Sequence, residues 1–133
     1  MDEFNKLLRA MTLEFFGTGS HKITPEKLFQ TDDAVFLDVR SKEEKESISL
    51  PLHHQVTAIQ IPVDDIPDRV SEVPRDKMVG IFCSSDVRSS IVYAYLRMNG
   101  YTNVRIVVGG YAPLAEQLKP GKVWQQIKRS ERQ

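Results

Sequence analysis

The chain has 133 residues, enough for one domain with its own core, and 41% of them are hydrophobic. Its 18 basic residues balance its 18 acidic ones, so the charge gives no indication of a nucleic-acid or anionic-membrane partner. A single cysteine excludes an internal disulfide, and no Cys-x-x-Cys spacing indicates structural zinc. The chain shows neither a secretion signal at its start nor an apolar run of membrane-spanning length, so we expect a cytoplasmic protein.

Residues 1–20 are expected to form an N-terminal helical extension. Charged side chains occupy several faces of this helix, while apolar ones recur at helical spacing, at Phe4, Leu7, Leu8, Met11 and Phe15. The helix should end at the breaker sequence Gly-Thr-Gly-Ser, residues 17–20. We expect the apolar stripe to pack on the core of the domain itself, with a partner subunit or a membrane surface as the alternatives.

The main domain is expected over residues 21–121, where apolar runs alternate with helical patterns. The apolar runs predict strands at 34–39, 58–61, 78–83 and 104–108. The helical patterns lie at 25–29, 41–47, 90–99 and 113–118. This alternation favours an α/β fold in which helices cover both faces of a mainly parallel sheet. Residues 122–133 are expected to form a charged C-terminal tail.

The only cysteine, Cys83, stands at the C-terminal end of a predicted strand. The polar loop 84–89 follows it, and a helix comes next. A helix N-terminus favours an anion and Arg88 adds a positive charge, so the thiol is placed to ionise. Ligands of parallel sheets also bind at this end of the strands. The alternative is that Cys83 is a small buried hydrophobic residue, as most lone cysteines are.

Three short motifs occur in order along the chain. Residues 37–40 read Leu-Asp-Val-Arg and are followed by Glu44. Residues 83–89 read Cys-Ser-Ser-Asp-Val-Arg-Ser, and residues 107–111 read Val-Val-Gly-Gly-Tyr. Together these motifs resemble the strand end, the cysteine loop and the double-glycine turn of a single rhodanese-like sulfurtransferase domain. The resemblance extends from about residue 23 to residue 117.

The resemblance implies a rhodanese-like fold, with a central five-stranded sheet and helices on both faces. It also implies that Cys83 takes a sulfane sulfur from a donor such as thiosulfate, polysulfide or a persulfide. The resulting Cys83 persulfide would pass the sulfur to cyanide, a thiol or a protein. Cys83 and Arg88 are then the catalytic residues, and the loop should form a cradle whose amides point at the sulfur. The cradle residues are Ser84, Ser85, Asp86, Val87 and Ser89.

The chemistry of the loop agrees with this role. Amide donors and a helix N-terminus can stabilise the anionic outer sulfur of a persulfide. Cys83 would serve in turn as nucleophile, covalent carrier and leaving group, so no metal or organic cofactor is needed. Four residues separate Cys83 from Arg88, whereas phosphatases related to this fold have five. The smaller ring suits a single sulfur better than a tetrahedral oxyanion.

Other polar residues receive lesser roles. Asp38 and Arg40 stand near a strand end, where such a pair usually braces a loop, so we expect them to support the cradle. The adjacent His53 and His54 could ligate a metal, but they lack an acidic or thiol partner at ligand spacing. We therefore expect no metal site.

Asp86 is the main departure from the family pattern, which usually has glycine there. Aspartate tolerates the left-handed backbone that such a position requires. If its carboxylate points into the cradle, it should raise the pKa of Cys83 and repel thiosulfate; if it points outward or pairs with Arg88, the effect should be small. This departure and the altered segment after Glu44 support a second hypothesis, a rhodanese-like binding or regulatory module with little turnover. The oligomeric state is left open.

Overall fold

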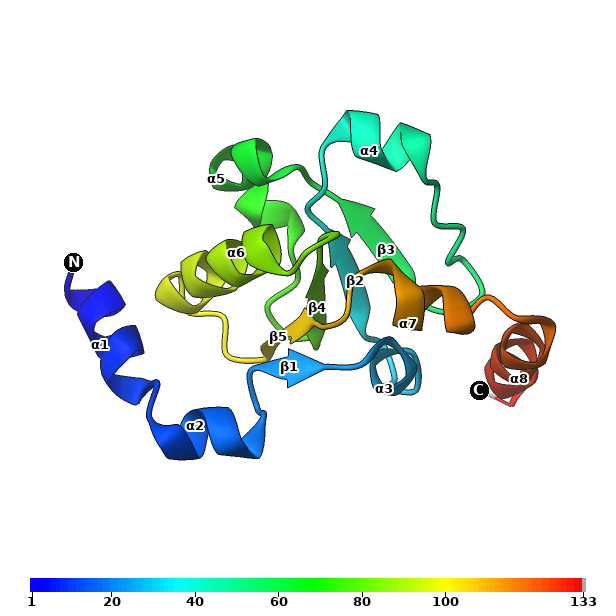
Figure 1. The fold of residues 1–133 in the computed structure, drawn as a ribbon, viewed down its shortest axis with the longest axis horizontal. Helices are drawn as coiled ribbons and strands as arrows, with labels where there is room; N and C mark the ends of the chain where they lie inside the picture. The colour runs from blue at the N-terminus through cyan, green and yellow to red at the C-terminus, as the bar shows by residue number, and fades with distance from the viewer. Residues whose placement is uncertain (133) are drawn as a thin grey trace.

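The computed structural model describes residues 1–132 and contains one five-stranded sheet with helices on both faces (Figure 1). All pairs of neighbouring strands are parallel, in the order β1-β5-β4-β2-β3. The strands are β1 (Lys22–Ile23), β2 (Val35–Asp38), β3 (Thr57–Gln60), β4 (Val79–Phe82) and β5 (Val104–Val107). The predicted α/β class and parallel sheet are confirmed.

Successive residues of β4 face two different hydrophobic cores. Val79 and Ile81 lie in a core that also holds side chains of α5 (Ile66–Arg69) and α6 (Val87–Met98), whereas Phe82 lies in the other. That second core includes side chains of α3 (Pro25–Phe29) and α7 (Tyr111–Glu116). Strands covered on both sides need apolar residues at every position, which is why they form continuous apolar runs. Cys83 belongs to the core on the α6 side.

Helix α4 (Lys42–Ser47) follows β2 and lies beyond the C-terminal ends of the central strands (Figure 1). It begins with a capping box, in which the Ser41 hydroxyl accepts from the Glu44 amide and the Glu44 carboxylate accepts from the Ser41 amide. The capping box therefore fixes the Glu44 side chain at the edge of the sheet where Cys83 lies.

The connection from β3 to β4 contains two 3-10 turns, η1 (Val63–Asp65) and η2 (Val70–Glu72), on either side of α5.

The N-terminal extension consists of two helices, so the prediction of one continuous helix is wrong. Helix α1 (Asp2–Ala10) ends before Met11, and α2 (Leu13–Thr18) begins after Thr12, whose hydroxyl accepts from the Phe15 amide. This cap holds Thr12 in an extended conformation, which interrupts the helix. The stripe packs on the α6-side core through Met11 and Phe15, and Leu7 is also buried. Leu8, also assigned to the stripe, is half exposed.

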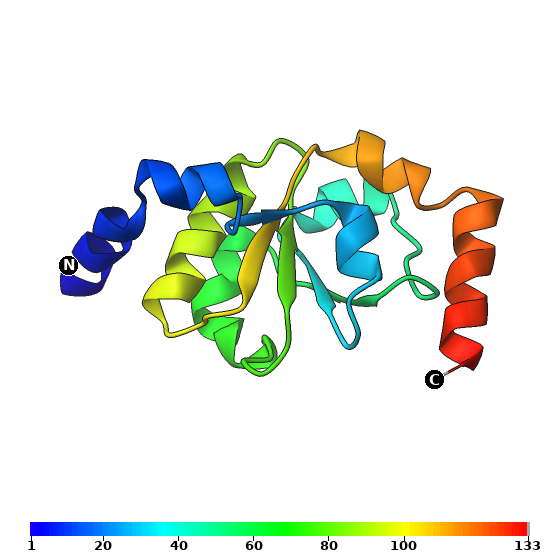
Figure 2. The same ribbon diagram turned by 90° about the horizontal axis from the view of Figure 1, so that it is seen from below.

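The predicted C-terminal tail is largely helical. Helix α8 (Pro120–Glu131) begins with Pro120, a residue that fits the first helical position. It lies at the end of the molecule opposite α1 (Figure 2). Arg129 attaches it to the domain by donating to the carbonyls of Phe29 and Gln30 and by pairing with Asp32. Gln133 of the predicted tail lies outside the described residues.

None of the helices within residues 1–132 has the length and hydrophobicity that a bilayer-spanning segment requires.

Candidate active site

Cys83 follows the last residue of β4 and has no exposed surface. Asp38 pairs with Phe82 across the parallel strands, and the Val39 amide donates to the Phe82 carbonyl, so Val39 lies beside Cys83. Three residues, Ser84 to Asp86, then separate Cys83 from α6. The helix begins at Val87, three residues before the predicted start. Arg88 and Ser89 are therefore in the first turn of α6. The backbone amides of this turn have no partner within the helix and are available to the sulfur.

Hydrogen-bond donors from the loop and the first turn of α6 surround the thiol. The Ser89 amide donates to Cys83 Sγ at 3.3 Å, and the Ser89 hydroxyl lies 3.5 Å from the same sulfur. Burial raises the pKa of Cys83, but the Ser89 hydroxyl and the amides of Ser89, Ser85 and Arg88 outweigh it, so the pKa is lower than that of an ordinary thiol. Local hydrogen bonding thus stabilises the thiolate in a fully buried position.

The Asp86 backbone is left-handed, with φ 67°, as expected for a residue in the place of glycine. Its carboxylate oxygen Oδ2 accepts a hydrogen bond from the Gly109 amide at 3.3 Å. The side chain therefore joins the turn after β5 and points away from the cradle instead of into it or toward Arg88, while its other oxygen, Oδ1, is buried without a hydrogen-bond partner among residues 1–132.

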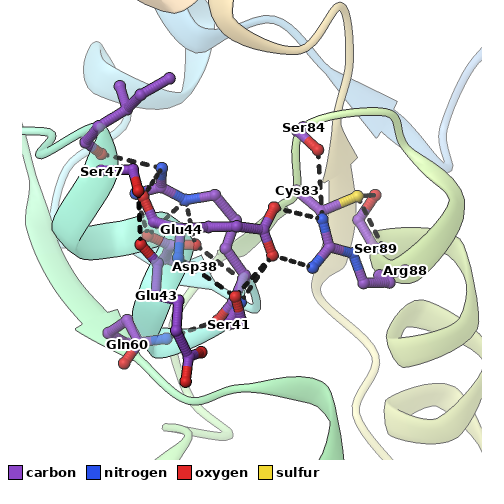
Figure 3. Close-up of polar contacts among 12 residues, drawn as sticks. Asp38, Ser41, Glu43, Glu44, Ser47, Gln60, Cys83, Ser84, Arg88 and Ser89 are labelled. Atoms are coloured by element: carbon purple, nitrogen blue, oxygen red, sulfur yellow. Dashed lines mark hydrogen bonds and ion pairs between the residues drawn. The ribbon is translucent and has the colours of Figure 1, made fainter.

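Arg88 forms an ion pair with Glu44, a residue that lies 44 positions earlier in the chain. The guanidinium donates to the two carboxylate oxygens at 2.5 and 2.8 Å, and to the Ser84 hydroxyl at 3.2 Å (Figure 3). These bonds with Arg88, joined by those from Ser41, lower the pKa of Glu44 to about 2, and the same ion pair raises the pKa of Arg88. Both side chains are about one-third exposed, at 31% and 34%.

Asp38 and Arg40 form a second, buried ion pair. Arg40 is 0% exposed and donates to both carboxylate oxygens of Asp38, with the shortest contact at 2.8 Å. Its remaining N–H groups reach the Ile48 carbonyl at 2.9 Å and the Tyr111 hydroxyl at 3.1 Å. Arg40 therefore connects the end of β2 to the end of α4 and to the start of α7.

The double-glycine turn packs directly against the Cys83 loop. Gly110 has φ 64°, and a Cβ atom there would lie only 2.6 Å from the Ser84 carbonyl oxygen. Helix α7 begins directly after this turn, two residues before the predicted start, and the Tyr111 ring packs edge-on against Phe82 at 5.6 Å. The close approach of backbone to backbone requires the absence of a side chain at Gly110.

His53 and His54 do not take part in this arrangement. Their rings lie 4.1 Å apart and line a separate hollow together with residues around Asp33 and α8. Within residues 1–132, no group of three or more His, Cys, Asp or Glu side chains is placed to hold a metal ion.

The arrangement of strand end, cysteine loop and double-glycine turn agrees with the family comparison. The profile of the rhodanese-like domain family matches residues 25–117. The chain belongs to the rhodanese-like family. This match covers the Asp38, Cys83 and Gly110 regions described above.

Other members of the rhodanese-like family resemble the chain over most of its length. A sulfurtransferase of Allochromatium vinosum is 36% identical over 85 residues, which are 64% of this chain and 75% of that protein. A rhodanese-related protein of Thermoplasma volcanium has a TM-score of 0.62 and 25% identity, over 75% of this chain and 95% of that one. A rhodanese-like domain protein of Staphylococcus aureus has a TM-score of 0.59 and 31% identity, over 70% and 89% of the two chains.

The structure brings together most of the residues selected from the sequence, and it adds Glu44 and Tyr111. Ser89, Ser85 and Arg88 supply donors to the sulfur, while Val87 is exposed. Glu44 was visible only as part of a motif, without a role. Its contact with Arg88 joins distant segments, so no local pattern in the sequence indicates it.

Proposed function

We propose that this rhodanese-like protein is a sulfurtransferase that carries sulfane sulfur on Cys83. The observation that supports this most directly is the contact of the Ser89 amide and hydroxyl with Cys83 Sγ. These donors favour the thiolate, which is the form of cysteine that attacks sulfur. The proposed partners are a small sulfur donor and a thiol, cyanide or protein acceptor.

The reaction has two steps. In the first, the Cys83 thiolate attacks the sulfane sulfur of the donor, an S–S bond forms, and the donor leaves with the electron pair of its broken bond. In the second, the acceptor attacks the outer sulfur of the persulfide, and Cys83 leaves as a thiolate. The amides around Cys83 can stabilise the anionic sulfur at both stages.

The other residues around the loop have proposed roles, and those of Arg88, Asp38 and Arg40 follow from their contacts. Ser84, Ser85, Asp86, Val87 and Ser89 form the cradle. Arg88 anchors it by binding Ser84 and Glu44. Asp38 and Arg40 support the cradle indirectly: Asp38 holds Arg40, and Arg40 fixes Tyr111 next to the double-glycine turn that packs against the loop.

Intact-mass measurement after incubation with polysulfide tests the proposal. We expect the protein to gain the mass of one sulfur, cyanide to remove it, and Cys83→Ser to acquire none. Absence of an adduct with polysulfide, persulfide and thiosulfate alike would overturn the proposal. That outcome would favour the second candidate, a binding module without turnover, which the complete burial of Cys83 supports.

A further inference from the structure

Both guanidinium groups beside the Cys83 loop are already paired with carboxylates. Arg40 is buried against Asp38, and Arg88 places two N–H groups on Glu44. The loop itself continues with two uncharged serines and then Asp86. The two cations of the site therefore add no net positive charge around the thiol, although amides and a hydroxyl still donate to it.

A hollow of about 230 Å³ opens beside Arg88 at the same edge of the sheet. Its lining is mostly apolar and includes Val39, which lies next to Cys83, and Pro62 and Val63 of the segment after β3. Asp64 also lines it, so the charged groups of the hollow are one acid and one guanidinium that Glu44 already neutralises. A donor that approaches here meets a surface with a negative balance of charge.

We propose that the site takes sulfur from persulfides whose carrier is neutral or cationic, and that Glu44 excludes the thiosulfate dianion by neutralising Arg88. This inference rests on the sulfurtransferase function proposed above. Every donor brings one sulfur that the amides can hold, but thiosulfate also brings a charged group of three oxygens. Those oxygens need a cation, but Glu44 neutralises the charge of Arg88 and takes two of its N–H groups. Ser84 takes a third N–H group, and Asp64 repels an anion.

The persulfide of cysteamine is a suitable probe, because its ammonium group balances the charge of its outer sulfur. The Cys83 thiolate attacks that outer sulfur, the S–S bond of the donor breaks, and cysteamine thiolate leaves with the electron pair. With thiosulfate, the same attack on the sulfane sulfur releases sulfite. Both reactions produce the same Cys83 persulfide, so the two rates can be compared directly.

The test is the ratio of the two loading rates, followed by intact mass in wild type, Glu44→Gln and Glu43→Gln. Glutamine can retain the capping box with Ser41 but not the charge that neutralises Arg88. We expect Glu44→Gln to raise the ratio of thiosulfate to cysteamine persulfide about tenfold, since one charge near a dianion is removed. Glu43, exposed on the same helix, is the matched control and should leave the ratio unchanged.

Asp64→Asn provides a second variant that does not involve the α4 cap, and it should shift the ratio in the same direction. An unchanged ratio in both Glu44→Gln and Asp64→Asn would overturn the inference while leaving the sulfurtransferase function intact. If thiosulfate loaded the wild type as fast as cysteamine persulfide does, the inference would likewise be overturned and the sulfurtransferase function left intact. Failure of both donors to load Cys83 would overturn the inference, and failure of polysulfide as well would remove the proposed function.

Discussion

The Asp86 carboxylate accepts a hydrogen bond from the Gly109 amide and so ties the Cys83 loop to the turn after β5. This contact places the one acidic side chain of the loop on a neighbouring turn. Asp86 thus combines a left-handed backbone, normally suited to glycine, with a bond that glycine cannot form. The aspartate that replaces the usual glycine of the family therefore has a structural role, because its side chain connects the Cys83 loop to the turn after β5.

Replacement of Asp86 tests this reading. Asp86→Gly should leave the pKa of Cys83 unchanged, because the carboxylate is directed to Gly109. Asp86→Ala should lower the free energy of unfolding by about 1–2 kcal/mol, since alanine loses the hydrogen bond from the Gly109 amide and tolerates a left-handed backbone less well than aspartate does. The pH dependence of iodoacetamide alkylation and urea unfolding measure the two quantities. A clear fall in the Cys83 pKa of Asp86→Gly would contradict the outward placement.

Ser89→Ala should raise the pKa of Cys83. The hydroxyl is the strongest of the groups that lower this pKa against the effect of burial, and the amide remains in the variant. At neutral pH a smaller fraction of Cys83 is then ionised, so sulfur loading slows. Alkylation rates across pH give the new midpoint. Ser90→Ala is the control, because the Ser90 hydroxyl donates to the Asp86 carbonyl. Equal midpoints in wild type and Ser89→Ala would exclude this role for the hydroxyl.

The Glu44–Arg88 pair predicts a loss of stability in acid. The folded-state pKa of Glu44 is about 2 against an ordinary value of 4.5, so the unfolded chain binds a proton more readily. The contribution of Glu44 is therefore present above about pH 4.5 and is lost as the pH falls toward 2. Urea unfolding at several pH values should show a steeper loss in wild type than in Glu44→Gln. Glu43→Gln should follow the wild type, and parallel curves for all three proteins would contradict the prediction.

Removal of Arg40 should destabilise the fold strongly. Arg40→Met leaves the Asp38 carboxylate buried without its partner, which typically costs about 3–5 kcal/mol. The double variant Asp38→Asn/Arg40→Met should recover part of that loss, because the unpaired charge is gone. Denaturant unfolding measures each free energy. If Arg40→Met were as stable as the wild type, or if the double variant lost the sum of the unfolding free energies that the two single variants lose, the result would argue against a shared ion pair.

The sequence predicts the sheet well because both faces of each central strand are covered. Apart from Asp38, residues 34–39 and 78–83 are apolar, and the observed strands begin and end one residue inside these ranges. The break at Thr12 depends on one side-chain cap, which the periodicity of the apolar residues does not register. The start of α6 at Val87 depends on the left-handed Asp86, so helical periodicity alone places it too late.

The site was predictable as far as its motifs are local. Cys83 lies directly before a short loop, and Arg88 and Ser89 lie in the first turn of the helix that follows it. Their proximity therefore follows from their closeness in the sequence. The ion pair of Arg88 with Glu44 requires α4 to lie over the C-terminal end of the sheet (Figure 1), which no spacing along the sequence specifies.

The position of Cys83 in the α6-side core also bears on its chemical durability. A thiolate in contact with water is readily oxidised to sulfenic and then sulfinic acid, and the second product is rarely reduced again. Cys83 has no exposed surface, so hydrogen peroxide meets the same packed residues that a sulfur donor must pass. Packing that restricts access to the sulfur should therefore also let the protein keep a low-pKa thiol under oxidative conditions.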